Sequence, residues 1–271
     1  MMTNNYICIT CGTQYTESNG PPERCPICED ERQYVGWAGQ QWTLLTDLRE
    51  KHRNVVEEDE PGLIGIVTDP PFAIGQRARL IQAPGGNVLW ECTSLVDSET
   101  VEAINRLGGV SAIAISHPHF YSSMVEWSLA FGEVPIYLHA DDHKWVMRPD
   151  PAIIFWEGEQ HSLGEGLTLV RCGGHFPGST LLHWADGAQG RGVLLTGDGI
   201  YVVSDRRYVS FMYSYPNAIP LSARALRRIV EAVEPFKFER LYSSWKDRVV
   251  LSDAHGVVRR SAGRYIEALE S

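Results

Sequence analysis

Three apolar stretches of this sequence each end at side chains that can bind a metal ion, and this pattern constrains the fold more than any other. The stretch VSAIAIS is followed by His117 and His119, LTLVRC by a glycine loop with His175, and GVLLTG by Asp198. Short apolar runs bounded by turn residues indicate buried strands. Ligands from several strand ends can assemble a site at one rim of a sheet, so we expect these four side chains to share an ion.

The residues around the histidines support this ligand role. Pro118 lies between His117 and His119 and stiffens the turn, which lets both rings face one ion. Gly173 and Gly174 precede His175, and small residues there let a ligand approach the backbone. A lone histidine is more often a hydrogen-bonded structural residue, but the features together favour metal binding.

Two close pairs of cysteines lie near the N-terminus, Cys8 with Cys11 and Cys25 with Cys28. Each pair places two thiolates at one tight turn, and two such turns can close a tetrahedron around an ion. The stretches CITCG and CPICED resemble the knuckles of rubredoxin-like zinc ribbons. We expect residues 1–36 to form a ribbon with a structural zinc ion, because this segment has few large aliphatic side chains to bury. Electron transfer and nucleic-acid binding are the alternatives for this segment.

The composition is that of a folded, acidic protein. With 271 residues, 44% of them hydrophobic, the chain can bury one large core beside the ribbon. A formal net charge of −10 argues against nucleic acid as a partner, because affinity for phosphates comes from Lys and Arg. No apolar run approaches about 20 residues, so we expect no membrane partner and a cytoplasmic location. Cys92 and Cys172 stand alone and are expected to be buried free thiols.

Strands and helices alternate through the rest of the chain. Strands are expected at GLIGIVTD, RARLIQAP, NVLWEC, VPIYLH and LLHW, with residues 84–87 closing a hairpin. Helices are expected in QQWTLLTDLREKH, after Asp97 or Ser98, after Ser222, and from about Gly256. The acidic stretch EEDEPG is expected to be a boundary loop. This order predicts two mixed sheets covered by helices on the outside.

The ligand pattern resembles that of the metallo-β-lactamase fold superfamily over roughly residues 60–271. Its hydrolases carry an H-x-H-x-D-H motif, a later G-G-H-x-P-G-S-type loop and a G-D turn, which match His117, His119, His175 and Asp198 here. The resemblance implies an α+β fold for residues 37–271, a four-layer αββα sandwich with the metal site between the sheet edges. Glu91 matches the early aspartate that orients the metal loop in the family.

The chain departs from this family at the second metal. Tyr121 and Ser122 stand where the family places an aspartate and a third histidine, and Trp245 stands at the place of the final histidine. His255, in SDAHG, is the alternative for that last role. Phenol, hydroxyl and indole groups are poor ligands for a dication. We therefore expect a single zinc, iron or manganese ion in the histidine site and a degenerate second site.

We expect a small molecule as the partner, and two functional hypotheses follow. The sequence leaves the oligomeric state open. In the first, the protein hydrolyses a small ester, thioester or lactone, because three imidazoles on zinc lower the pKa of bound water to about 7. Asp198 is then a fourth ligand or accepts a hydrogen bond from that water, and Tyr121 donates to an oxyanion or leaving group. Arg206 and Arg207 lie in an aromatic loop that either covers a sheet edge or closes over an anionic substrate. In the second, the protein is a catalytically silent binding or scaffold member of the fold.

Overall fold

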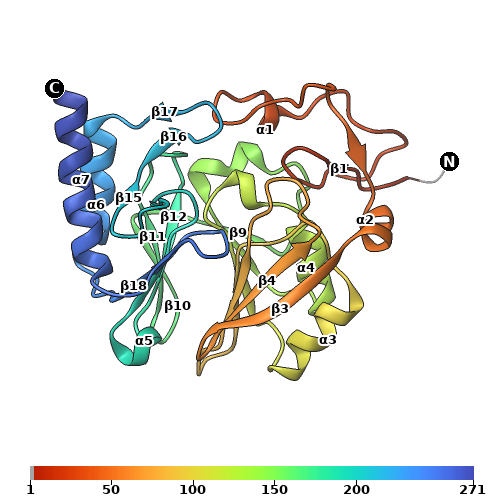
Figure 1. Cartoon of the computed structure of the whole chain (residues 1–271). Coiled ribbons are helices and arrows are strands. Elements are labelled where there is room, and N and C mark those ends of the chain that lie inside the picture. The colour runs from red at the N-terminus through yellow and green to blue at the C-terminus, as the bar shows by residue number, and fades with distance from the viewer. Residues whose placement is uncertain (1–2) are drawn as a thin grey trace. The chain divides into compact units, whose positions relative to one another are not determined.

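The computed structural model describes residues 3–271, which form two compact units (Figure 1). The first unit comprises the chain up to Leu138 together with His143–Phe155. The second comprises His139–Asp142 and Trp156–Ser271. The cysteine-rich N-terminal residues therefore belong to the same compact unit as the strands up to Leu138.

The first unit is built on a seven-stranded sheet with the order β3-β4-β5-β6-β7-β8-β9. Its first four strands pair antiparallel, whereas β6, β7 and β8 pair parallel. The hairpin predicted at residues 84–87 is confirmed, because it joins β5 to β6. The strands are Arg53–Glu60 (β3), Leu63–Asp69 (β4), Ala78–Ile81 (β5), Val88–Trp90 (β6), Ala112–Ala114 (β7), Ile136–His139 (β8) and Ile153–Trp156 (β9).

Short helices and a small two-stranded sheet complete the first unit. The helix expected after Asp97 is confirmed, since the Asp97 carboxylate accepts a hydrogen bond from Thr100 N at 2.8 Å and caps it. In the N-terminal segment, Ile7 packs against Leu48 and Leu95. The elements are Ile7–Cys8 (β1) paired with Trp42–Thr43 (β2), Pro26–Glu29 (α1), Leu45–Lys51 (α2), Ser98–Arg106 (α3), the 3-10 turn Pro118–Phe120 (η1), Met124–Ala130 (α4) and the 3-10 segment Ala140–Trp145 (η2), of which only His143–Trp145 belong to this unit.

The acidic stretch EEDEPG forms the end of strand β3 and its turn, so the prediction of a boundary loop was wrong. Buried arginines at the start of β5, two strands away in the sheet, account for the difference. Asp59 binds Arg77 at 2.7 Å and Arg79 at 2.9 Å, and Glu57 binds Arg77 at 2.8 Å. The two arginine side chains are 1% and 3% exposed, so their charges require these carboxylates. Strand residues with acidic side chains are therefore held in place by partners 18–20 positions away in the sequence.

The second unit is built on a six-stranded sheet with the order β10-β11-β12-β13-β18-β19. All neighbouring strands pair antiparallel except β13 and β18, which are parallel. The strands are Gln160–Gly164 (β10), Leu167–Arg171 (β11), Thr180–Trp184 (β12), Val193–Leu195 (β13), Arg240–Tyr242 (β18) and Val249–Val250 (β19). Two small hairpins follow β13, formed by Tyr201–Val202 (β14) with Val209–Ser210 (β15) and by Met212–Ser214 (β16) with Ile219–Pro220 (β17).

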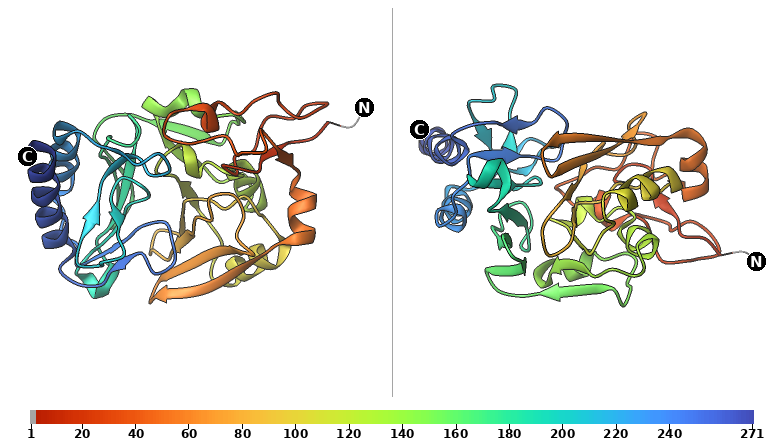
Figure 2. Two further views of the ribbon diagram at one scale, coloured as in Figure 1. Left: turned by 45° about the horizontal axis from the view of Figure 1, so that its top comes forward. Right: turned by 90° about the horizontal axis from the view of Figure 1, so that it is seen from below.

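The two C-terminal helices lie side by side against the sheet of the second unit (Figure 2). They are Ala223–Val233 (α6) and Ala254–Glu270 (α7), and a short turn of helix, Gly187–Gly190 (α5), precedes β13. Ser222 caps α6 by accepting a hydrogen bond from Ala225 N, as the sequence predicted. The apolar faces of both helices bury Leu226, Ile229 and Val258 in one cluster with strand residues. Of the helices in residues 3–271, none is long and apolar enough to cross a membrane.

Asp59→Ala should lower the free energy of unfolding of the protein by about 3 kcal/mol or more, because it removes the carboxylate that binds two buried guanidinium groups. Asp69→Ala is the matched control, since Asp69 pairs with Arg53 at an exposed position and such pairs contribute less than about 1 kcal/mol. Urea denaturation followed by tryptophan fluorescence measures both changes. Equal losses in the two variants would contradict the role assigned to Asp59.

Candidate metal centres

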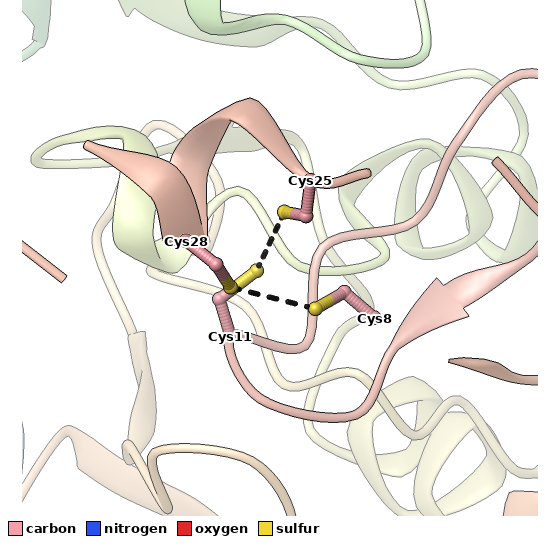
Figure 3. Close-up of side chains that lie close together, drawn as sticks. All are labelled: Cys8, Cys11, Cys25 and Cys28. Carbon is pink, nitrogen blue, oxygen red and sulfur yellow. Dashed lines mark hydrogen bonds between the residues drawn. The ribbon is translucent and has the colours of Figure 1, made fainter. Parts of the chain in front are cut away.

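The four predicted cysteine ligands meet in the first unit. Figure 3 shows their side chains pointing toward one another from two turns of the chain. The sulfur atoms of Cys8 and Cys28 lie 3.6 Å apart and those of Cys11 and Cys25 lie 3.7 Å apart. All four ligand atoms lie within 4.8 Å of one another, and all four side chains are buried as free thiols.

This geometry fits a zinc ion. Zn–S bonds of about 2.3 Å give a regular tetrahedron with sulfur–sulfur edges of about 3.8 Å, close to the observed separations. Two donors from the same unit reach the sulfurs: the Tyr15 hydroxyl donates to Cys25 Sγ at 3.0 Å and Gln40 Nε2 donates to Cys8 Sγ at 3.1 Å. Hydrogen bonds from the neighbouring thiols, that of Cys11 foremost, hold the pKa of Cys8 far below its ordinary value. The hydrogen bonds from Tyr15 and Gln40 support negative charge on two of the four sulfurs, as ligand thiolates require.

His117 and His119 come together at the end of strand β7, also in the first unit. Their ring centroids lie 5.2 Å apart, with the ring planes at 72°. His117 is extended, with φ −168°, and Pro118 then begins a single 3-10 turn that brings the second ring beside the first. Both side chains are buried. Proline between the histidines thus has the predicted effect of setting a sharp turn.

Neighbouring polar groups hold this pair in place. The Ser116 hydroxyl lies 2.7 Å from Nδ1 of His117, and the buried carboxylate of Glu91 accepts a hydrogen bond from Ser116 N at 3.2 Å. Burial, followed by the positive charge of Arg32, lowers the pKa of His117 to about 3. The imidazole is therefore neutral at physiological pH, which is the form that binds metals. Glu91 sits where the family resemblance placed it, supporting the loop that carries the histidines.

His175 and Asp198 come together in the second unit. His175 Nε2 lies 3.8 Å from Asp198 Oδ2, and both side chains are buried. His175 Nδ1 lies 3.2 Å from the carbonyl oxygen of Met212, which can only accept a hydrogen bond. Nδ1 therefore carries the proton and Nε2, facing Asp198, keeps its lone pair. Burial raises the pKa of the Asp198 carboxyl to about 6, against the opposing effect of His175.

Glycines set the backbone around these two side chains. Gly173 and Gly174 both have positive φ, at +66° and +82°. A Cβ on Gly174 would lie 2.9 Å from Ile229 Cδ1 of helix α6, so the loop packs too closely for a larger residue. The Tyr215 hydroxyl donates to the Asp198 carbonyl oxygen at 3.0 Å and fixes the other loop.

The residues expected to mark a lost second metal site have other neighbours. Trp245 packs against Tyr201 with ring centroids 5.5 Å apart, and Tyr201 packs in turn against Tyr215 at 4.9 Å. Tyr215 lies 5.9 Å from the ring of His175. An aromatic cluster thus adjoins the pair of His175 and Asp198 within the second unit. His255 lies near the start of α7, 3.8 Å from Glu234 and against Phe238.

The remaining predicted site residues lie in two places. Tyr121 is buried directly after η1, where it lines a small cavity with Gln14 and Ser122. Arg206 and Arg207 are exposed in the turn between β14 and β15, where Arg207 pairs with Asp205 at 2.8 Å. The predicted free thiols Cys92 and Cys172 are buried, which confirms that prediction.

Sequence reasoning missed the donors to the cysteine sulfurs and the charge of Arg32. Tyr15 and Gln40 carry no motif, and their spacing from the cysteines follows no rule. Arg32 lies four residues after Cys28, and the sequence analysis treated it only as a basic residue of an acidic segment. Its effect on His117 depends on a fold that brings positions 32 and 117 near each other.

Comparison with solved structures defines the class of fold. DIM-1 metallo-β-lactamase exposed to ceftazidime matches 80% of this chain and 98% of its own with a TM-score of 0.58 and 10% identity. The metallo-β-lactamase FIM-1 from Pseudomonas aeruginosa, in its mono-zinc form, matches 78% of this chain and 95% of its own with a TM-score of 0.57 and 12% identity. At these identities the likeness concerns the fold alone. The chain has the metallo-β-lactamase fold with a cysteine ribbon at its N-terminus, as the sequence predicted.

A sequence relative defines the family. The Bacillus subtilis (strain 168) protein named "Uncharacterized protein YmaE" is 53% identical over 268 residues, covering 98% of this chain and 97% of that protein. The chain therefore belongs to the YmaE family. No protein-family model matches the sequence.

Purified protein should carry one zinc ion in the ribbon, and Cys8→Ser/Cys11→Ser should lose it, because two ligands cannot hold the ion against competing water. Elemental analysis measures the loss. Cys172→Ser is the control, since it removes a buried thiol outside the ribbon. A full complement of zinc in the double variant would contradict the ligand assignment.

Proposed function

We propose that this protein is a metal-dependent hydrolase of a small ester, thioester or lactone. In this proposal His117, His119 and His175 hold one zinc, iron or manganese ion. Asp198 is a fourth ligand or accepts a hydrogen bond from water at the ion. The two pairs of side chains belong to different units of the chain, and the proposal joins them because the strand ends that carry them follow the ligand order of the metallo-β-lactamase fold.

The observation that carries the proposal is the way the imidazoles are held. Nδ1 of His117 is engaged by Ser116 and Nδ1 of His175 by the Met212 carbonyl group. Ligand histidines in metalloproteins are oriented in this manner, through a hydrogen bond at the nitrogen that does not bind the ion. We therefore assign Nε2 of both residues as the ligand atom.

A zinc ion held by three imidazoles supplies hydroxide near neutral pH. The chain's own residues would orient the substrate and handle protons around that centre. Asp198, buried beside His175, is placed to bind the ion or to accept a hydrogen bond from water there. Tyr121 stays a candidate donor to an oxyanion or leaving group.

A single ion is the expected number because the second-site positions are filled by other groups. The aromatic rings of Tyr201, Tyr215 and Trp245 pack together beside His175 and Asp198. One solved neighbour, FIM-1, is described in a mono-zinc form, so this fold is compatible with one zinc ion. The same aromatic surface would suit a substrate with a flat or apolar group.

The rival function is a catalytically silent binding or scaffold protein. The observation in its favour is that aromatic and hydroxyl side chains replace several ligands of the second metal. We further propose a small-molecule partner and a cytoplasmic location, because paired free thiols such as those of the ribbon persist in a reducing compartment.

A panel of simple esters, thioesters and lactones with added zinc, iron or manganese separates the two functions. The parent protein should bind one ion besides the ribbon ion and turn over at least one substrate, and His119→Ala should lose both properties. His255→Ala is the control. It should retain metal binding and turnover, because His255 pairs with Glu234 at the end of helix α6. Metal binding without turnover on any substrate favours the scaffold. Loss of an ion in His255→Ala would instead indicate a second metal site with His255 as a ligand.

Arg206 and Arg207 are proposed to bind an anionic group of the substrate. Replacing both with alanine should raise KM for an anionic substrate several-fold and leave kcat less changed, because the residues act on binding and not on the reacting bond. Arg259→Ala/Arg260→Ala is the control, since it removes the same charge from helix α7. Equal KM values in the parent and Arg206→Ala/Arg207→Ala would assign the loop to packing.

A further inference from the structure

The ribbon is hydrogen-bonded to the segment that follows the two histidines. Gln14, three residues after the ligand Cys11, donates its backbone N–H to the Ser122 carbonyl oxygen at 3.0 Å. Ser122 lies three residues after His119. Both ends of this bond are buried and both belong to the first unit. The first cysteine turn and the histidine loop are therefore in direct contact.

A second connection runs through Ser94. The Ser123 hydroxyl donates to the Ser94 carbonyl oxygen at 2.8 Å, and the Ser94 hydroxyl donates to the Gly12 carbonyl oxygen at 2.8 Å. All three residues lie in the interior, where each hydrogen bond satisfies a group that water cannot reach. Gly12 has φ +82°, and a Cβ at this position would overlap Ser94 Oγ. A glycine directly after Cys11 is thus required for this contact.

Ser122 itself adopts a backbone conformation that needs support. Its φ is +44°, in the left-handed region that non-glycine residues rarely occupy. Gln76 Nε2 donates to its hydroxyl at 2.6 Å while Gln14 binds its carbonyl group. Such a conformation persists where surrounding contacts determine it, and one of these contacts comes from the ribbon.

The second cysteine turn is anchored in the first unit through Arg32. Arg32 follows Cys28 by four residues and its guanidinium group is held by Asp30, at 2.6 Å from Nε and 2.9 Å from Nη2. It also lies 5.6 Å from the centre of the Trp145 ring. The second cysteine turn is thereby packed within the same unit as the histidine loop.

We propose that the ribbon is a positioning device for the histidine site, with Gln14, Ser94, Ser122 and Ser123 as positioning residues. The ribbon ion fixes the conformation of the turn at Cys11–Gln14. The hydrogen bonds described above then hold the loop with His117 and His119 against this turn in one conformation. This inference rests on the proposed function, because it assigns the two histidines to a metal. Ser122, which stands where the family places a ligand of the second metal, instead accepts hydrogen bonds from Gln14 at its carbonyl group and from Gln76 at its hydroxyl.

The test breaks the contact without touching a cysteine. Gly12→Ala introduces a methyl group that overlaps Ser94 Oγ, and Ser123→Ala removes a hydroxyl group from the same chain of hydrogen bonds. Gly39→Ala is the matched control for Gly12→Ala. Gly39 also has a positive φ, at +80°, but a Cβ there meets nothing within 4 Å.

We expect both contact variants to retain the ribbon zinc by elemental analysis. Their histidine site should bind Co²⁺, measured by competition with a chelator on zinc-loaded ribbon, about tenfold or more weakly than the parent, as for other residues that orient metal ligands. Gly39→Ala should match the parent. Unchanged Co²⁺ affinity in both Gly12→Ala and Ser123→Ala, with the ribbon ion retained, overturns the proposal.

Hydrogen exchange separates this proposal from the proposed function. If the parent binds no Co²⁺ beyond the ribbon ion, the proposed function fails, and exchange of the Phe120, Tyr121 and Met124 amides then decides the positioning role. These amides form the hydrogen bonds of the loop itself. Gly12→Ala should accelerate their exchange while Gly39→Ala leaves it at the parent rate. Equal rates in the two variants overturn the positioning role.

Discussion

A strand that is buried on both faces excludes polar side chains that have no partner, and this constraint arranges the candidate histidine site. Strands β7, β11 and β13, which precede His117, His175 and Asp198, are buried along most of their length. The ligand candidates lie where strand pairing stops and the backbone turns. His117 and His175 are then held at the strand ends by Ser116 and the Met212 carbonyl group.

The same rule of satisfying buried polar groups governs the rest of the first unit. Arg77 and Arg79 are buried in the sheet because Asp59 binds both of them. Ser94 and Ser123 are buried because each donates to a carbonyl group of another segment. Buried polar networks of this kind fix a single arrangement of the chain, since every alternative leaves a group without its partner. The stability of the unit and the placement of its histidines therefore have a common physical origin.

The ribbon and the histidine loop represent two uses of coordination in one unit. Four buried cysteines that could hold an ion stand where the N-terminal segment lacks a large apolar core. On the proposed assignment, the imidazoles hold an ion that takes part in catalysis. The ligands of a second metal are replaced by aromatic rings in one unit and by residues that contact the ribbon in the other. A segment that resembles a separate structural module thereby acquires a part in the site.

Local pattern was sufficient to predict the elements and the ligand candidates. The apolar runs predicted the strands before His117, His175 and Asp198, the caps predicted α3 and α6, and the cysteine spacing predicted the ribbon cluster. These features depend on residues close together in the sequence, so their physical cause is visible there. The acidic end of β3 was mistaken for a loop because its stabilising arginines lie 18–20 positions away.

Tertiary structure alone decided which distant groups satisfy the buried polar atoms. In the sequence, Ser122 stands only as a replacement for an expected metal ligand. In the fold, its carbonyl group accepts a hydrogen bond from Gln14 and its hydroxyl accepts one from Gln76. Tyr15, Gln40 and Arg32 likewise acquire their roles only when the ribbon closes around the cysteine cluster. The physical reason is that the residue type of a polar side chain sets how many hydrogen bonds it needs, whereas the path of the backbone sets which partners come within reach.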